Sequence, residues 1–131
     1  MANVRIGDVW KDFLNASFID FIDKQLTDGI CEDDIILATV MVISNICQGP
    51  QSAQLLSRKL FKSILILFIE KVEDPEFTIQ LLYAIYMFIS HRLCVEDILE
   101  EGEVLMRLLL LIESPFEPIR KANDDVLNIL R

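Results

Sequence analysis

Histidine is almost absent from this chain, and its scarcity limits the chemistry that the chain can perform. The 131 residues contain one histidine, His91, and three cysteines, none of them in a Cys-x-x-Cys pair. Because a structural zinc site normally has four ligands, no metal site is expected. A serine nucleophile needs a base that faces it, whereas His91 directly follows Ser90. We therefore predict no catalytic residues, no metal-binding residues and no enzyme activity.

Glycine and cysteine are too few and too scattered for two further kinds of site. The glycines lie singly at positions 7, 29, 49 and 102, so no glycine-rich phosphate loop is present and no cofactor is expected. An odd number of cysteines in apolar surroundings argues against a disulfide framework and favours a reducing, intracellular compartment. The first residues, MANVRIGDVWKDF, lack an uninterrupted apolar stretch, so no signal peptide is predicted.

Basic residues are outnumbered, and the apolar stretches are short. The chain has 21 acidic and 12 basic residues, and a net charge of −9 opposes binding to a nucleic-acid backbone. The charge-free stretch 77–90 contains Thr, Gln and Ser and is shorter than the roughly 20 apolar residues that span a bilayer, so no membrane insertion is expected. Apolar residues, in contrast, are abundant: they make up 53% of the chain, and the mean hydropathy is +0.41. A folded domain is predicted, and part of its surface is expected to meet other protein.

Apolar residues recur at spacings of three and four along the whole chain, which predicts an all-α fold. Breaks are expected at three turn sequences, QGP (48–50), EDPEF (73–77) and SPFEP (114–118), because Gly and Pro end helices and Asp caps them. No strand or hairpin signal is present. The expected helices cover 16–26, 33–47, 52–58, 60–72, 76–91, 95–101, 103–113 and 119–131.

An internal period supports a repeat architecture. The sequences VISNIC (42–47), IYMFIS (85–90) and DVLNIL (125–130) align, with separations of 43 and 40 residues between their Ile residues, and 61–71 matches 104–114. These spacings fall in the range of armadillo and HEAT repeats, about 40–47 residues. We predict one domain, 1–131, that is a right-handed α-solenoid with a partial repeat at about 16–47 and repeats at about 51–90 and 94–131. A non-repetitive helical bundle is the alternative.

The stretch VISNICQGP resembles the third helix of an armadillo repeat, in which an Asn precedes Ile or Leu. In that family the Asn, together with a Trp four residues earlier in the nuclear-import receptors, faces a groove that holds an extended peptide. The Trp series is absent here and the Asn series is interrupted by a Phe, which argues against binding of a nuclear-import signal. The resemblance nevertheless implies a partner-binding groove at six positions: Met41, Asn45, Ala84, Phe88, Asp124 and Asn128.

Three stretches resemble late repeats of the kinesin-associated protein family, in the same order: 32–47, 73–91 and 118–130. The most specific is EDPEFTIQLLYAIYMFISH (73–91). The resemblance implies part of a longer solenoid that binds the tail segments of kinesin motors and links them to cargo adaptors in microtubule-based transport. It also implies a cytoplasmic location, near the cytoskeleton or a cilium, and end faces that allow self-association. Alternatives are an armadillo or HEAT scaffold unrelated to motors and a carrier of apolar ligands with a pocket near Tyr83 and Met87.

Overall fold

The computed structural model describes residues 15–29, 31–71 and 73–131, and this part of the chain is helical without strands. It forms seven α-helices and one short 3-10 helix, so the predicted all-α class is confirmed. The elements are α2 (Ala16–Thr27), α3 (Asp33–Ile46), α4 (Pro50–Glu70), α5 (Pro75–Ser90), α6 (Val95–Glu100), α7 (Gly102–Leu110), η2 (Leu111–Glu113) and α8 (Glu117–Leu130).

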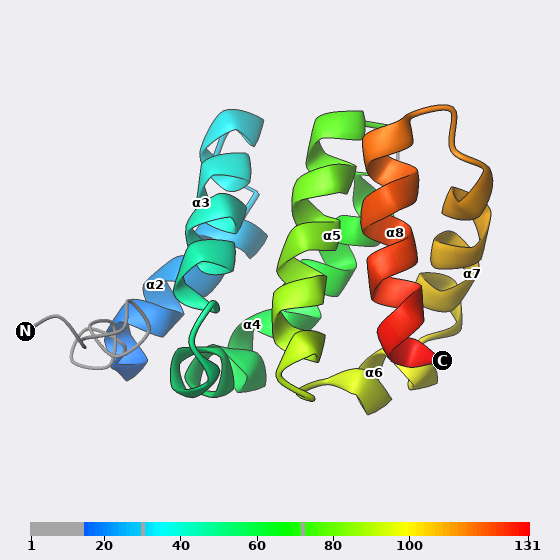
Figure 1. The fold of residues 1–131 in the computed structure, drawn as a ribbon. Coiled ribbons are helices and arrows are strands. Elements are labelled where there is room, and N and C mark those ends of the chain that lie inside the picture. Colours follow the sequence, from blue (N-terminus) through cyan, green and yellow to red (C-terminus); the bar gives the residue numbers. More distant parts are fainter. Residues whose placement is uncertain (1–14, 30, 72) are drawn as a thin grey trace, which may run out of the picture.

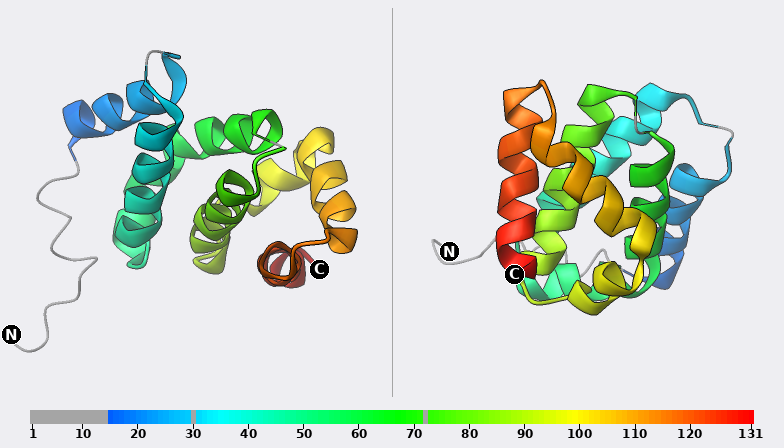
Figure 2. Two further views of the ribbon diagram at one scale, coloured as in Figure 1. Left: turned by 90° about the horizontal axis from the view of Figure 1, so that it is seen from above. Right: turned by 90° about the vertical axis from the view of Figure 1, so that its right-hand side faces the viewer.

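The longer helices lie in two rows. In Figure 1, α3, α5 and α8 stand side by side, and α5 lies between the other two. The helices α2, α4 and α7 form the second row, seen from above in the left view of Figure 2. Within the rows α3 packs on α5 and α5 on α8, while α2 packs on α4 and α4 on α7. Because α4 also packs against α5, the helix α5 has neighbours on three sides.

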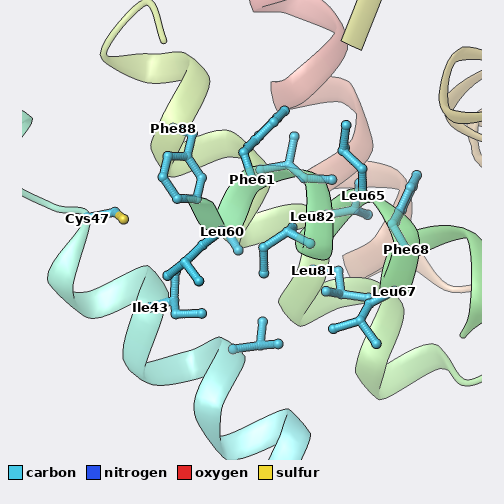
Figure 3. Packing of buried hydrophobic residues seen from close by; sticks show 14 of the residues in the cluster. Ile43, Cys47, Leu60, Phe61, Leu65, Leu67, Phe68, Leu81, Leu82 and Phe88 are labelled. Atoms are coloured by element: carbon cyan, nitrogen blue, oxygen red, sulfur yellow. The ribbon is translucent and has the colours of Figure 1, made fainter. Parts of the chain in front are cut away.

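The core forms between the two rows, where buried apolar side chains of α3, α4 and α5 pack together (Figure 3). Phe88 of α5 meets Phe61 of α4 edge to face, with ring centroids 5.3 Å apart and planes inclined by 78°. Such aromatic pairs stabilise a fold by roughly 0.5–1.5 kcal/mol beyond the burial of their area. Both rings are buried together with Leu60 and Leu81, so the contact joins the two rows.

The structure corrects the prediction of two helices at 52–58 and 60–72. A single helix, α4, runs through both segments over 21 residues. Leu56 and Leu60 are both fully buried and continue one apolar face across the expected break. The residues between them include neither Gly nor Pro, so nothing interrupts the backbone hydrogen bonds.

The start of α5 agrees with the prediction from EDPEF. The Asp74 side chain caps the helix, because its Oδ1 accepts hydrogen bonds from the backbone N–H groups of Glu76 (3.1 Å) and Phe77 (3.2 Å). Pro75 occupies the first turn, where its missing N–H costs nothing. After the helix, Arg92 and Cys94 both have a left-handed backbone with φ of 64°. This conformation is unusual for residues other than Gly and produces the sharp turn into α6.

Candidate protein-interaction surface

The six predicted groove residues all lie on α3, α5 and α8, but they do not share one surface. Met41, Asn45, Asp124 and Asn128 are exposed. Ala84 and Phe88 have an exposed fraction of 0%. As placed, these two side chains cannot touch a partner, and the predicted groove is corrected at α5.

The burial of Ala84 and Phe88 results from the central position of α5. Since α3, α4 and α8 all pack against this helix, only a narrow strip of it remains at the surface. The strip carries Tyr83, with an exposed fraction of 43%, and the half-buried Gln80 and Met87. Tyr83, and not Phe88, is therefore the exposed aromatic side chain of α5.

Tyr83 borders a hollow between α5 and α8 that the sequence did not reveal. The hollow has a volume of about 330 Å³, and its lining residues are Tyr83, Glu117, Pro118, Lys121, Ala122 and Asp125. The spacing of Glu117, Lys121 and Asp125, four residues apart, was visible in the sequence as one helix face. Its position beside Tyr83 depends on how α8 packs on α5, which no local pattern specifies.

The charged residues that line this hollow argue against an apolar ligand as its occupant. Three of its six lining residues are charged, whereas sites for small molecules are lined mainly by apolar side chains. The exposed face of α8 carries three carboxylates, Glu117, Asp124 and Asp125, against one amine, Lys121. Within the described residues none of these four groups takes part in an ion pair; the pairs found there are Lys59–Asp20 and Lys71–Asp33. The surface is thus acidic, with carboxylates available to a partner.

The match to known families covers the whole chain. The sequence model of the family described as Kinesin-associated protein (KAP) matches residues 1–131. This chain belongs to the kinesin-associated protein family. The match includes residues 1–31, where the sequence stretches discussed above carried no specific resemblance. No solved structure matches the chain.

Two thiols of this KAP-family chain, those of Cys47 and Cys94, are not poised for reaction. Burial raises the pKa of Cys47 to about 12, with a smaller effect of the nearby Cys94. The pKa of Cys94 is also raised to about 12, chiefly by burial and then by the charge of Asp97. Because the thiolate is the reactive form, both cysteines are inert near neutral pH.

His91, the lone histidine, donates a hydrogen bond from Nε2 to the Cys47 carbonyl oxygen at 2.9 Å. It therefore links the ends of α3 and α5.

The described helices contain neither a metal-binding cluster nor a membrane-spanning segment. In residues 15–29, 31–71 and 73–131, no three His, Cys, Asp or Glu side chains gather where they could hold a metal ion. No helix in this part of the chain combines the length and the apolar composition needed to cross a membrane.

Proposed function

We propose that this chain is a non-enzymatic scaffold that binds tail segments of kinesin motor subunits in the cytoplasm and links them to cargo adaptors. Membership of the kinesin-associated protein family is the observation that carries this proposal. The exposed α3–α5–α8 surface supports it, since this surface combines an aromatic side chain with unpaired charges.

We further propose that the two rows are part of a right-handed α-solenoid of armadillo type. The pairs α2–α3 and α4–α5 and the group α6–α7–α8 correspond to the units 16–47, 51–90 and 94–131. The packing of each long helix on its counterpart in the next unit supports this assignment. A solenoid presents an extended surface, which suits an extended peptide.

The proposed binding surface comprises exposed residues of all three helices in the row. Met41 and Asn45 lie on α3, Tyr83 on α5, and Asp124 and Asn128 on α8. The excess of carboxylates on α8 favours a tail segment rich in Lys or Arg. Tyr83 can stack with the guanidinium of an Arg, a contact that contributes about 0.5–1 kcal/mol at exposed sites.

Fluorescence anisotropy with labelled tail segments of the two motor subunits tests this surface. We expect Tyr83→Ala to weaken binding, and Asp124→Lys with Asp125→Lys to weaken it about tenfold, equivalent to about 1.4 kcal/mol. Leu55→Ala is the matched control, because Leu55 is an exposed side chain of α4, in the other row. The Leu55→Ala variant should bind the tail segments with the same affinity as the unchanged chain.

Two results would contradict the proposal at different points. If the tail segments bind the Tyr83 and Asp124/Asp125 variants as well as the unchanged chain, the α3–α5–α8 surface is not the binding site. If no tail segment binds the unchanged chain, the link to motors is lost and a scaffold with other partners remains.

A further inference from the structure

The helix α4 has an exposed face that the proposed tail-binding surface does not use. Leu55, Arg58, Lys62 and Ile66 are all exposed, and their spacings of three, four and four residues place them in line on one side of the helix. We call these four residues the α4 face. At 1.5 Å per residue the line is about 16 Å long. The α4 face therefore has two cations in its middle and an aliphatic side chain at each end, with exposed fractions of 42% for Leu55 and 52% for Ile66.

A hollow adjoins each half of the α4 face. The first, of about 570 Å³, is lined by Gln51, Gln54, Leu55 and Arg58. The second, of about 160 Å³, is lined by Lys62, Leu65, Ile66, Ile69, Glu101 and Val104. Each hollow thus brings one cation together with one exposed aliphatic side chain, a combination that suits a carboxylate beside an apolar group.

The two cations of the α4 face are available to a partner. The neighbouring Lys59 is paired with Asp20, whereas Arg58 and Lys62 form no ion pair with any residue that the structure describes. Among the residues that line the two hollows, Glu101 is the only carboxylate. The α4 face is thus positive on a chain whose net charge is −9, and its complement is an acidic partner.

The number of cations and their spacing favour an acidic protein segment over a membrane. Segments that bind anionic lipids typically cluster about four to eight Lys or Arg residues, and the α4 face has two. The net charge of the chain also repels an anionic surface. Residues three, four and seven apart are those through which one helix contacts another. A helix laid along α4 can therefore meet all four side chains.

We propose that the α4 face binds an acidic amphipathic helix of a partner protein, laid along α4. Two carboxylates of that helix, four residues apart, pair with Arg58 and Lys62. One apolar residue on each side of the carboxylates covers Leu55 or Ile66. This inference does not rest on the binding of motor tails, which is assigned to the other row.

Fluorescence anisotropy of two labelled alanine-rich helical peptides, titrated with the whole chain at low ionic strength, tests the proposal. One peptide carries Leu, Glu, Glu and Leu at spacings of three, four and four residues. The other carries them in the reverse order, because the bound helix can run in either direction. We expect at least one peptide to bind and to lose affinity as salt is added. Arg58→Glu with Lys62→Glu should weaken this binding about tenfold, since two exposed attractions become repulsions.

Lys121→Glu with Arg131→Glu is the matched control for the reversal at Arg58 and Lys62. It makes the same change of net charge at two exposed positions, on α8 and directly after it. The control should bind the acidic peptide as tightly as the unchanged chain does. Replacing both Glu residues of the peptide by Gln should weaken binding as much as the reversal does. Circular dichroism confirms that each variant keeps its helix content.

Glu101 provides a variant that should bind the acidic peptide more tightly. Its carboxylate lines the second hollow and repels an acidic helix, and it makes no capping hydrogen bond to α7. Glu101→Gln should therefore raise the affinity while the fold is kept. Ile66→Ala should lower the affinity, because it removes an apolar contact at one end of the α4 face.

Three results would overturn the proposal. Neither peptide could bind the unchanged chain. The reversal at Arg58 and Lys62 could leave the affinity unchanged or lower it no more than the control does, which would indicate the net charge rather than the α4 face. Vesicles of phosphatidylserine and phosphatidylcholine could bind through Arg58 and Lys62 while the peptides do not, which would make the α4 face a lipid site.

Discussion

Asn123 is a polar residue in the core, and its contact ties α8 to α7. Its side chain has an exposed fraction of 0%, and its Nδ2 donates a hydrogen bond to the Leu108 carbonyl oxygen at 2.8 Å. Asn123→Ala removes the donor and leaves that buried carbonyl without this partner. We expect the free energy of unfolding to fall by about 1–3 kcal/mol, measured by urea denaturation.

Asn128→Ala provides the comparison for Asn123. Asn128 lies on the same helix but is exposed, so its loss should change the free energy of unfolding by no more than about 0.5 kcal/mol. Equal stabilities for the two variants would show that the contact between Asn123 and Leu108 contributes nothing.

The buried thiol of Cys47 should make stability depend on pH in the alkaline range. Burial raises its pKa from 9.0 to about 12 in the folded chain. Between these values the unfolded chain loses the thiol proton and the folded chain retains it, so unfolding is favoured as pH rises. The loss approaches about 1.4 kcal/mol per pH unit from this group.

Urea denaturation at a series of pH values above 8 measures this effect. Cys47→Ala should give a shallower decline of stability with pH than the unchanged chain. Cys31→Ala, at a half-buried cysteine, is the control for the loss of a thiol. An unchanged slope in Cys47→Ala would mean that Cys47 titrates alike in the folded and unfolded chains.

At the residue scale, the exposure of a side chain was predicted correctly from the sequence only on helices that have few neighbours. Asn45 and Asn128 were expected at the surface and are exposed, on helices at the two sides of the row. Phe88 holds the equivalent position in the repeat but is buried, because α5 is covered on three sides. Equivalent positions of a repeat thus differ in exposure according to neighbours that local sequence does not encode.

At the scale of elements, α4 is the clearest departure from the sequence prediction, and its continuity can be tested. Arg58 is exposed in the middle of the helix, so its side chain makes little difference to packing. Arg58→Pro, however, removes one backbone hydrogen bond and clashes with the preceding turn. We expect a loss of about 3 kcal/mol or more in the free energy of unfolding, visible as a lower melting temperature.

Arg58→Ala serves as the control for the proline variant, because it removes the same side chain and keeps the backbone N–H. Its melting temperature should stay near that of the unchanged chain. A proline variant as stable as the alanine variant would support two separate helices, as the sequence suggested.

Elements bounded by strong local signals were predicted well, and those without such signals were not. The start of α5 was predicted from EDPEF, since an Asp cap and a following Pro act within one turn. The continuity of α4 was missed because three successive polar residues, Ser57 to Lys59, resemble a connection. Their helical conformation depends on the buried Leu56 and Leu60 on either side, which pack against other elements.

For the whole molecule, the central position of α5 predicts that this helix is the last to unfold locally. Exchange of its amide hydrogens requires breaking contacts with α3, α4 and α8 together. We therefore expect the slowest exchange among the described residues in the buried middle of α5, around Ile85. The short helix α6 should exchange fastest. Hydrogen exchange followed by mass spectrometry measures this order, and equal rates in α5 and α6 would contradict it.

The helical class and the order of the helices followed from periodicity across the whole molecule, but the interaction surface did not. The 43-residue spacing relates 61–71 to 104–114, yet the apolar residues of the first segment are largely buried, whereas in the second four of the eight are exposed and two, Val104 and Leu108, are buried. The difference arises because α4 has neighbours on both sides in its row, whereas among the described helices α7 has one. A period in the sequence identifies the repeating unit, but it does not determine which residues of each unit are exposed.

The two-row packing also has a consequence for how the chain folds. The principal contacts join helices that are close in chain order, such as α3 with α5 and α5 with α8. These contacts close loops of about one repeat rather than of the whole chain, which limits the chain entropy lost before they form. During synthesis, α2 to α5 can assemble before α8 has left the ribosome, and each later helix then adds to a surface that is already formed.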